Sequence, residues 1–256
     1  MMKTVVCHIY NEHYLLPWWL KYHRAVFDHG IIIDYASTDG SVDIVKSMCP
    51  TWEVLPSRNR DFEAHKVDQE VMEVEKGIEG WKCCLNVTEF LLGNFSLLTE
   101  SSDQLQYFAP CFAMVDENME DRQPDYSKHI FEQFYHGMDI RRSTDLYCWR
   151  EIHNFDMVYR PGRHFRPGHH FDERFATDYK FIVLKYVFAP MTEDMINRKL
   201  QIQHKIPPSD VRKNRGHYHH DHGRGLTRDK LINRYNIHKI MSGNIKTIID
   251  EFNPLK

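Results

Sequence analysis

The first ninety or so residues alternate between short apolar runs and segments with helical periodicity, and this alternation is the strongest constraint on the fold. Apolar runs at residues 4–10, 31–34, 52–55 and 81–85 predict four strands. The segments between them predict helices, most clearly over residues 62–80, where apolar side chains recur every three or four positions. Strands separated by helices in this way run parallel, so we expect an α/β fold with a mixed, mainly parallel sheet flanked by helices.

Residues 31–41 join the second strand to the second helix and concentrate small polar side chains. Three consecutive isoleucines are typical of a strand that is buried on both faces. Asp34, Ser37, Thr38 and Asp39 follow within a few positions. Ligands of open α/β sheets bind at the carboxyl ends of strands, which favours a binding site here. A loop that only caps the next helix explains the same residues equally well.

Two other predicted strands also end in polar residues. Strand 4–10 is followed by Asn11 and Glu12, and strand 81–85 by the sequence Asn86-Val87-Thr88-Glu89. The carboxyl ends of parallel strands lie at one edge of a sheet, so we expect the three polar ends to converge. Convergence of three polar strand ends favours a binding site more strongly than any single loop does.

Composition narrows the class of protein. The 256 residues carry a net charge of −3 with His neutral, which gives no electrostatic basis for nucleic-acid binding. The six cysteines contain no C-x-x-C pair, which indicates reduced thiols and a cytoplasmic protein. The N-terminus lacks the apolar core of a signal peptide, and no apolar run reaches the ~18 residues of a membrane span, so we expect no transmembrane segment.

Asn11-Glu12, the helix with Trp18-Trp19-Leu20-Lys21-Tyr22-His23, and residues 34–41 together resemble family 2-like glycosyltransferases of the GT-A fold. The similarity is closest to the compact branch with W-x-x-Y-H in the first helix and S-T-D-x-S after the second strand. It covers the first four strands. The resemblance implies transfer of a hexose or deoxyhexose, with inversion, from a nucleotide-diphosphate sugar donor to a hydroxyl acceptor in glycan or polysaccharide synthesis.

The resemblance also assigns the nucleotide-binding residues. In the family, the polar end of the first strand and the acidic residue of the second hold the base and ribose. The corresponding positions here are Asn11, Glu12 and Asp34, with Ser37, Thr38 and Asp39 nearby. Carboxylates accept hydrogen bonds from ribose hydroxyls and base N–H groups, which fits these assignments. We further expect Asp68 and Arg58 to face the same pocket, where Arg58 suits a phosphate.

The family's metal-binding D-x-D motif corresponds to Asn86-Val87-Thr88, which has no carboxylate. The resemblance implies a Mn²⁺ or Mg²⁺ ion, here held by Asn86, Thr88 and Glu89, with a C-terminal histidine as a further ligand. His219 is the first candidate for that histidine and His217 the second. Three outcomes are open: Glu89 holds the ion with help from elsewhere, positive side chains replace the ion, or the protein binds donor without turning it over.

Inverting transfer requires a base for the acceptor hydroxyl and positive charge for the leaving diphosphate. Carboxylates beyond the motif are the candidates for the base: Glu151, Asp156, Asp172, Glu173 and Asp178. We predict Asp172 as the base, because it follows His169-His170-Phe171 after a loop rich in Gly and Arg, and Glu89 as the second catalytic residue. Candidates for contact with phosphate or acceptor are Arg163, His164 and Arg198.

The chain divides at residue 205 in this interpretation. Residues 1–92 form the nucleotide-binding half, residues 93–205 the acceptor and catalytic half, and residues 206–256 a His-rich loop with a helical tail. Two alternatives remain: a donor-binding protein without turnover, and a His-rich metal-dependent protein. A zinc hydrolase is disfavoured, because the sequence has no H-E-x-x-H and no cysteine ligand spacing.

Overall fold

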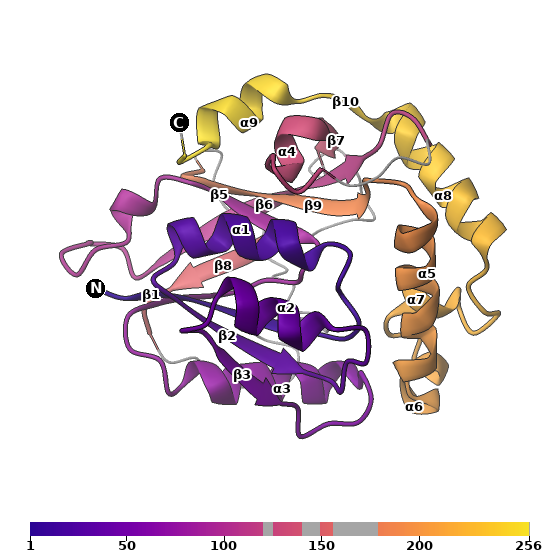
Figure 1. Cartoon of the computed structure of the whole chain (residues 1–256), viewed down its shortest axis with the longest axis horizontal. Coiled ribbons are helices and arrows are strands. Elements are labelled where there is room, and N and C mark those ends of the chain that lie inside the picture. Colours follow the sequence, from indigo (N-terminus) through magenta and orange to yellow (C-terminus); the bar gives the residue numbers. More distant parts are fainter. Residues whose placement is uncertain (120–124, 140–148, 156–178, 256) are drawn as a thin grey trace.

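The computed structural model describes residues 1–119, 125–139, 149–155 and 179–255. A mixed sheet lies at the centre with the strand order β10-β7-β6-β8-β4-β1-β2-β3, and β9 pairs with β5 and β6 beside it. Helices flank this sheet and continue along one margin of the molecule (Figure 1). The α/β class with a C-terminal helical extension is therefore confirmed, in a layout that agrees with the GT-A type expected from the sequence.

The N-terminal half holds the parallel part of the sheet. Its strands are β1 (Lys3–Ile9), β2 (His29–Asp34), β3 (Glu53–Pro56) and β4 (Trp81–Cys84). They pair in parallel in the order β4-β1-β2-β3. The helices between them are α1 (Leu16–Val26), α2 (Ser41–Met48) and α3 (Ala64–Glu75). Buried side chains of α1 and α2 pack on one face of the sheet, and those of α3 on the other.

Helix α3 is shorter than the helix predicted over residues 62–80. After Glu75 the amides of Gly77 and Ile78 bond to carbonyls three residues back, which tightens the chain into a turn. Gly80 then adopts a left-handed conformation with φ of 93°. A Cβ on Gly80 would lie 2.4 Å from the carbonyl oxygen of Met2, so the turn into β4 requires glycine.

The second half of the chain completes the sheet around β6 (Gln106–Val115). This strand pairs antiparallel with β7 (His136–Asp139) and β8 (Trp149–His153), and parallel with β9 (Phe181–Phe188). Strand β9 also pairs with β5 (Glu89–Gly93). The short elements η1 (Phe95–Leu97) and α4 (Ile130–Gln133) complete this half.

The C-terminal elements line one margin of the molecule and return over its top (Figure 1). They are α5 (Glu193–Gln201), η3 (Ile202–Lys205), α6 (Pro208–Arg212), α7 (His217–His220), α8 (Arg228–Met241), β10 (Gly243–Asn244) and α9 (Lys246–Phe252). Helix α5 continues directly into the 3₁₀ turn η3. Division of the chain at residue 205 stays a prediction, and β10 joins the C-terminal segment to β7.

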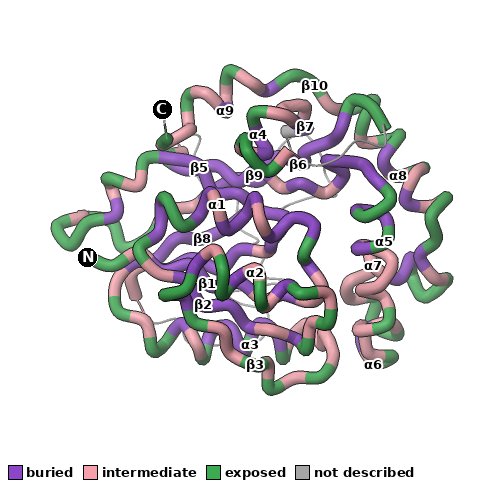
Figure 2. Tube along the Cα trace, viewed as in Figure 1, coloured by how far each residue is buried: buried purple, intermediate pink, exposed green. Residues whose placement is uncertain are grey.

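Helix α1 is largely buried (Figure 2). Its aromatic side chains anchor the strand that carries Glu89. The indole N–H of Trp19 donates to the carbonyl oxygen of Glu89 at 3.0 Å. The hydroxyl of Tyr22 donates to the carbonyl oxygen of Leu91 at 2.8 Å. Burial lowers the pKa of His23 to about 3, so this histidine packs as a neutral ring. The W-x-x-Y-H motif therefore belongs to the core. In the described part of the chain, no helix is both long and apolar enough to cross a membrane.

Candidate functional site at the carboxyl edge of the sheet

The polar ends of β1, β2 and β4 lie at one edge of the sheet, as the sequence predicts. Ile9 of β1 is paired with Asp34 of β2, so Asn11 and the residues after Asp34 leave the sheet side by side. Val6 of β1 is paired with Cys84 of β4, which places the residues after Cys84 at the same edge. Parallel pairing is the cause, because it aligns the carboxyl ends of neighbouring strands.

Hydrogen bonds join the loops after β1 and β2 into one unit. The backbone N–H of Asn11 donates to Ser37 Oγ at 3.0 Å, and that of Thr38 donates to Asn11 Oδ1 at 2.7 Å. The backbone N–H of Ser37 donates to Asp34 Oδ1 at 3.1 Å. Asn11 itself has φ of 51°, a conformation that asparagine tolerates better than most residues. The predicted nucleotide residues are thus brought together in a preorganised edge.

Asp39 holds the two loops together from the other side. One carboxylate oxygen accepts from the backbone N–H and hydroxyl of Ser41, at 3.0 and 2.6 Å. The other accepts from the backbone N–H of His13 at 3.0 Å and lies 2.8 Å from its ring Nδ1. Burial alone would raise the pKa of Asp39, but the hydrogen bonds from Ser41 and His13 lower it. These contacts leave Asp39 a structural role at the start of α2.

We expect Asp39→Ala to lower the free energy of unfolding by about 1–2 kcal/mol, because several N–H and O–H donors lose their acceptor. Urea denaturation measures this change. Asp43→Ala is the matched control, since Asp43 lies in the first turn of the same helix. Equal stability of the Asp39 and Asp43 variants would contradict the structural role of Asp39.

Helix α5 closes this edge through two buried contacts. Arg198 forms a bidentate ion pair with Glu12, with its Nη2 at 2.6 Å from Glu12 Oε1. Gln201 and Asn11 exchange hydrogen bonds: Gln201 Nε2 donates to the Asn11 carbonyl at 3.0 Å, and Asn11 Nδ2 donates to Gln201 Oε1 at 3.1 Å. The side chains of Asn11 and Glu12 are therefore already bonded to protein groups. Arg198, predicted to contact phosphate or acceptor, neutralises a buried carboxylate here.

An aromatic surface lies next to the polar edge, on the α3 side of the sheet. The rings of Tyr35 and Phe62 are 4.6 Å apart, and those of Tyr10 and Phe62 are 6.0 Å apart. The ammonium of Lys205 lies 4.3 Å from the ring centroid of Tyr10 and donates to the Tyr35 carbonyl at 3.3 Å. Planar rings beside hydrogen-bonding loops suit a nucleobase, which offers a face for stacking and edges for hydrogen bonds.

Glu89 is fully buried, and its carboxylate makes ion pairs and hydrogen bonds with three neighbouring residues. Arg150 donates to it from Nε and Nη2, both at 2.7 Å, and Lys185 Nζ lies 3.0 Å away. The backbone N–H of Asn86 adds a hydrogen bond of 2.9 Å. Burial alone would raise the pKa of Glu89, but the charges of Arg150 and Lys185 hold it well below its usual range. The contacts favour a structural ion-pair role over the predicted roles as metal ligand and catalytic group.

The predicted metal site has few suitable groups around it. Thr88 is buried and Asn86 half-buried, and Asn86 Nδ2 is directed to Glu89 Oε1 at 3.3 Å. Within residues 1–119, 125–139, 149–155 and 179–255, no group of three His, Cys, Asp or Glu side chains is arranged to hold a metal ion. The Mn²⁺ or Mg²⁺ site at Asn86, Thr88, Glu89 and His219 therefore stays a prediction.

Positive side chains act electrostatically on His219, the predicted C-terminal metal ligand. Burial, together with the charges of Arg198 and Lys185, lowers the pKa of Lys199 to about 7. Burial and the charges of Lys199, Arg198 and Lys185 lower the pKa of His219 to about 3. The charges of Lys185, Lys199 and Arg198 therefore act on one another and on His219. Lys185, Lys199 and Arg198 are called the cationic cluster below, and His219 is a neutral ring coupled to it.

The His-rich segment is a short helix followed by a turn. His220 is buried, with its Nε2 at 2.8 Å from the Arg215 carbonyl and its Nδ1 accepting from the Gly223 N–H at 2.9 Å. Its imidazole therefore supports the loop and is not available to a ligand. The rings of His217 and His222 stack 5.1 Å apart. His219 remains the one histidine of α7 that is linked electrostatically to the cationic cluster.

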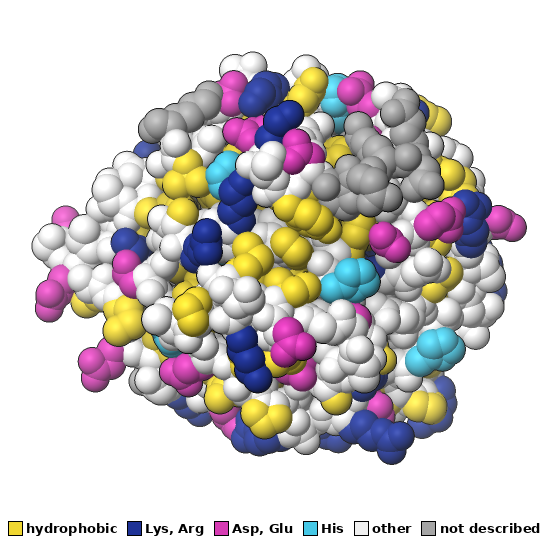
Figure 3. All heavy atoms as spheres, in the orientation of Figure 1, with side chains coloured by type: hydrophobic (Ala, Val, Ile, Leu, Met, Phe, Trp, Pro, Cys, Tyr) yellow, Lys and Arg dark blue, Asp and Glu magenta, His cyan; other side chains and the backbone are white. Residues whose placement is uncertain are grey.

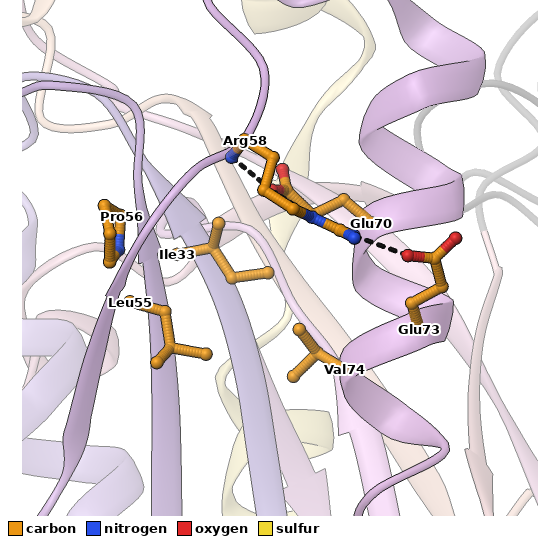
Figure 4. A pocket seen from close by; sticks show the side chains of 7 residues that line it. All are labelled: Ile33, Leu55, Pro56, Arg58, Glu70, Glu73 and Val74. Carbon is orange, nitrogen blue, oxygen red and sulfur yellow. Dashed lines mark hydrogen bonds and ion pairs between the residues drawn. The ribbon is translucent and has the colours of Figure 1, made fainter.

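Arg58 and Asp68 lie on the α3 side of the sheet, and their place in the nucleotide pocket stays a prediction. Arg58 lines a groove of about 290 Å³ with Ile33, Leu55 and Val74, and its guanidinium pairs with Glu73 at 2.6 Å (Figure 4). The guanidinium also lies 3.5 Å from Glu70. Asp68 is buried within α3.

Several candidates for catalysis lie outside the described residues: Asp156, Asp172, Glu173, Asp178, Arg163 and His164. Glu151, the remaining candidate, is buried in β8, and burial raises its pKa to about 7. Sequence reasoning missed Lys185, Lys199 and the aromatic pair Tyr10 and Phe62. One signal was present for Lys185, which is the single charged residue within the apolar run of β9.

Comparisons with known proteins add little at this level of similarity. No family model and no curated protein matches the chain. Among solved structures it is similar to residues 1–349 of TarS from S. aureus, with 14% identity and a TM-score of 0.33 over 49% of this chain and 39% of that chain. TarS in complex with UDP-GlcNAc gives 14% identity and a TM-score of 0.31 over 49% and 37%. The match thus spans less than half of TarS, and a likeness this low carries no argument about ligand or reaction.

Proposed function

We propose that the carboxyl edge of β1, β2 and β4 binds a nucleotide-diphosphate sugar and that the protein transfers the sugar to a hydroxyl acceptor. One observation carries this proposal: two preorganised polar loops and an aromatic surface lie beside a cluster of positive side chains. A nucleoside needs stacking and hydrogen bonds, whereas a diphosphate needs positive charge. The same edge supplies both. A hexose or deoxyhexose, transferred with inversion in glycan synthesis, is the proposed reaction.

The nucleoside half of the proposed site comprises the loops after β1 and β2. Asp34 and the Ser37–Asp39 turn offer acceptors and hydroxyls to ribose and base. Tyr10 offers an aromatic face to the base. Lys205, which now lies over Tyr10, would have to move or pack against the bound base, because it occupies the same side of the ring.

The diphosphate half of the proposed site is the cationic cluster. Lys185 and Lys199 extend from β9 and α5, and the neutral ring of His219 extends from α7. A lysine with a pKa near 7 gains a proton when a dianion binds beside it, since the new negative charge favours its charged form. The leaving diphosphate is thereby stabilised by protein cations. A Mn²⁺ or Mg²⁺ ion at Asn86 and Thr88 would add to this charge, and Asp172 is the proposed base.

Calorimetric titration with UDP, GDP and dTDP, each with and without Mn²⁺, tests donor binding. We expect one of them to bind, and Lys199→Met to weaken that binding by about ten-fold, the usual size for a lost charge-assisted hydrogen bond. Lys239→Met is the matched control, because Lys239 is an exposed lysine on α8. Binding of none of the three nucleotides would overturn the proposal. If nucleotide affinity requires Mn²⁺ and is the same in Lys199→Met as in the unchanged protein, a metal ion and not the cationic cluster binds the diphosphate.

A donor-binding protein without turnover is the second candidate function. The bonding of Glu89 to Arg150 and Lys185, together with the neutral Asn86-Val87-Thr88, favours it. Donor hydrolysis and an acceptor screen separate the two functions. Tight nucleotide binding with no consumption of any sugar donor would support the second candidate over the first.

A further inference from the structure

Positive charge is concentrated in the C-terminal segment of residues 198–239. This segment contains eleven Lys and Arg residues against three Asp, a net charge of +8, although the whole chain has −3. The rest of the chain therefore carries −11. The segment comprises the end of α5, then η3, α6, α7 and most of α8, which together occupy one margin of the molecule (Figure 1). In Figure 3, Lys and Arg side chains gather at the lower right margin, over α6.

Helix α8 in this segment has two apolar faces. The inner face carries Leu231 and Tyr235, which are buried against Val115 and Phe188. The outer face carries Ile237, Ile240 and Met241, whose exposed fractions are 49%, 86% and 54%. Spacings of three and four residues place these three side chains on one side of the helix. Large aliphatic side chains exposed together in one helical turn indicate an interaction surface.

Basic and aromatic side chains flank the outer face. Lys239 is exposed on one flank. Arg234 and Lys230 precede Ile237 on the same side of the helix, where they pair with Asp221 at 2.8 Å each. Tyr218 is 45% exposed, and its backbone carbonyl accepts from Arg234 at 2.8 Å. Exposed aliphatic side chains with Lys, Arg and Tyr close by are suited to contact with a membrane interface.

We propose that the outer face of α8 docks on the surface of an anionic lipid bilayer. Ile237, Ile240 and Met241 enter the boundary between headgroups and acyl chains. The exposed basic side chains of the segment, among them Arg212, Lys213 and Lys239, supply the charge that attracts the headgroups. This inference goes beyond the proposed function and does not depend on it. Figure 2 shows α8 at the periphery, with exposed stretches along its course.

Two other partners fit the surface less well. A nucleic acid would bind the positive charge, but it offers no apolar surface for three aliphatic side chains. A second copy of the chain would cover the aliphatic side chains, but it would bring two segments of +8 together, which repel each other. An anionic bilayer satisfies the charge and the apolar face at once.

Sedimentation with phosphatidylcholine vesicles, with and without phosphatidylserine, tests the proposal. We expect the protein to sediment with the phosphatidylserine vesicles and to be released by salt. The double change Ile237→Ser and Ile240→Ser should weaken binding at least about ten-fold, because the variant transfers less apolar surface from water into the bilayer. Lys239→Ala should weaken it about five-fold. Leu105→Ser is the matched control, since Leu105 is 58% exposed but lies outside the segment; it should bind as the unchanged protein does.

Other outcomes would overturn the proposal. Equal binding to vesicles with and without phosphatidylserine would remove the role of lipid charge. Equal binding of the double variant and the Leu105→Ser control would remove the role of the α8 face. A dimer in light scattering that the double variant abolishes would assign the face to a second copy. A labelled DNA duplex that displaces the vesicles would assign the segment to nucleic acid. All four changed side chains are exposed, and circular dichroism checks that each variant remains folded.

Discussion

Arg150→Met is expected to lower the free energy of unfolding by about 3–5 kcal/mol. Arg150 is 1% exposed, and its two hydrogen bonds of 2.7 Å run to the fully buried carboxylate of Glu89. Removal of the guanidinium leaves that carboxylate with Lys185 and the Asn86 amide, too few donors for a charge taken out of water. Urea denaturation of the purified variant measures the loss.

Two further variants show whether the loss comes from the ion pair. Lys185→Met should cost less, since the side chain of Lys185 is 21% exposed and water can replace it. The combined change Glu89→Leu and Arg150→Met should recover part of the stability, because a buried ion pair exchanged for apolar side chains costs little. A loss below about 1 kcal/mol in Arg150→Met, or a double variant less stable than both single ones, would contradict the structural role of this pair.

Glu75→Gln is expected to stabilise the protein at pH 8 and to leave it unchanged near pH 4. Glu75 is 2% exposed at the end of α3, and burial raises its pKa from 4.5 to about 8. Among the described residues no hydrogen bond reaches either of its carboxylate oxygens, and His153 Nε2 lies 3.8 Å from one of them. A neutral amide of similar shape avoids the cost of ionising this group.

The sign of the pH dependence follows from the raised pKa. Below pH 4.5 the Glu75 carboxyl is protonated in both the folded and the unfolded chain, so it does not affect stability. Between pH 4.5 and 8 the unfolded chain loses the proton first, and the folded state loses stability as pH rises. The full effect approaches about 3–5 kcal/mol at pH 8 and above. Glutamine removes this loss.

Thermal unfolding of Glu75→Gln and the unchanged protein across pH 4 to 9 measures the difference. Glu73→Gln is the matched control on the same helix, because hydrogen bonds from Arg58 and Gln69 lower the pKa of Glu73. That variant should gain no stability at high pH. A Glu75→Gln variant that gains nothing at pH 8 would show that the carboxylate of Glu75 is already ionised there without cost.

The parts of the structure that follow from local pattern were predictable. The isoleucines of β2 and the spacing of Val67 and Val71 in α3 report burial directly, because strands and helices repeat every two and 3.6 residues. The end of α3 was not predictable in the same way. It depends on a turn at Gly77–Gly80 that fits against Met2, a residue far away in the sequence.

The candidate site at the carboxyl edge also has a part that the sequence predicted and a part that it did not. The sequence places Asn11, Asp34, Ser37 and Thr38 at one edge, since parallel strands align their carboxyl ends, and the structure confirms that they meet. It does not reveal that Glu12 and Asn11 are bonded to α5, whose residues follow them by 186 and 190 positions. Contacts of such range depend on how the C-terminal segment packs.

The sequence alone determined the α/β class and the convergence of three polar strand ends. These features depend on periodicity and on parallel pairing, both of which are local or follow from strand order. Only the tertiary structure decided what the charged residues do. Glu89, expected at a metal ion, is bonded to Arg150 and Lys185, and burial with the charges of Lys199, Arg198 and Lys185 keeps His219, the other expected metal ligand, neutral. Ionic groups reveal their role through partners, and here those partners come from β8, β9, α5 and α7, far along the chain.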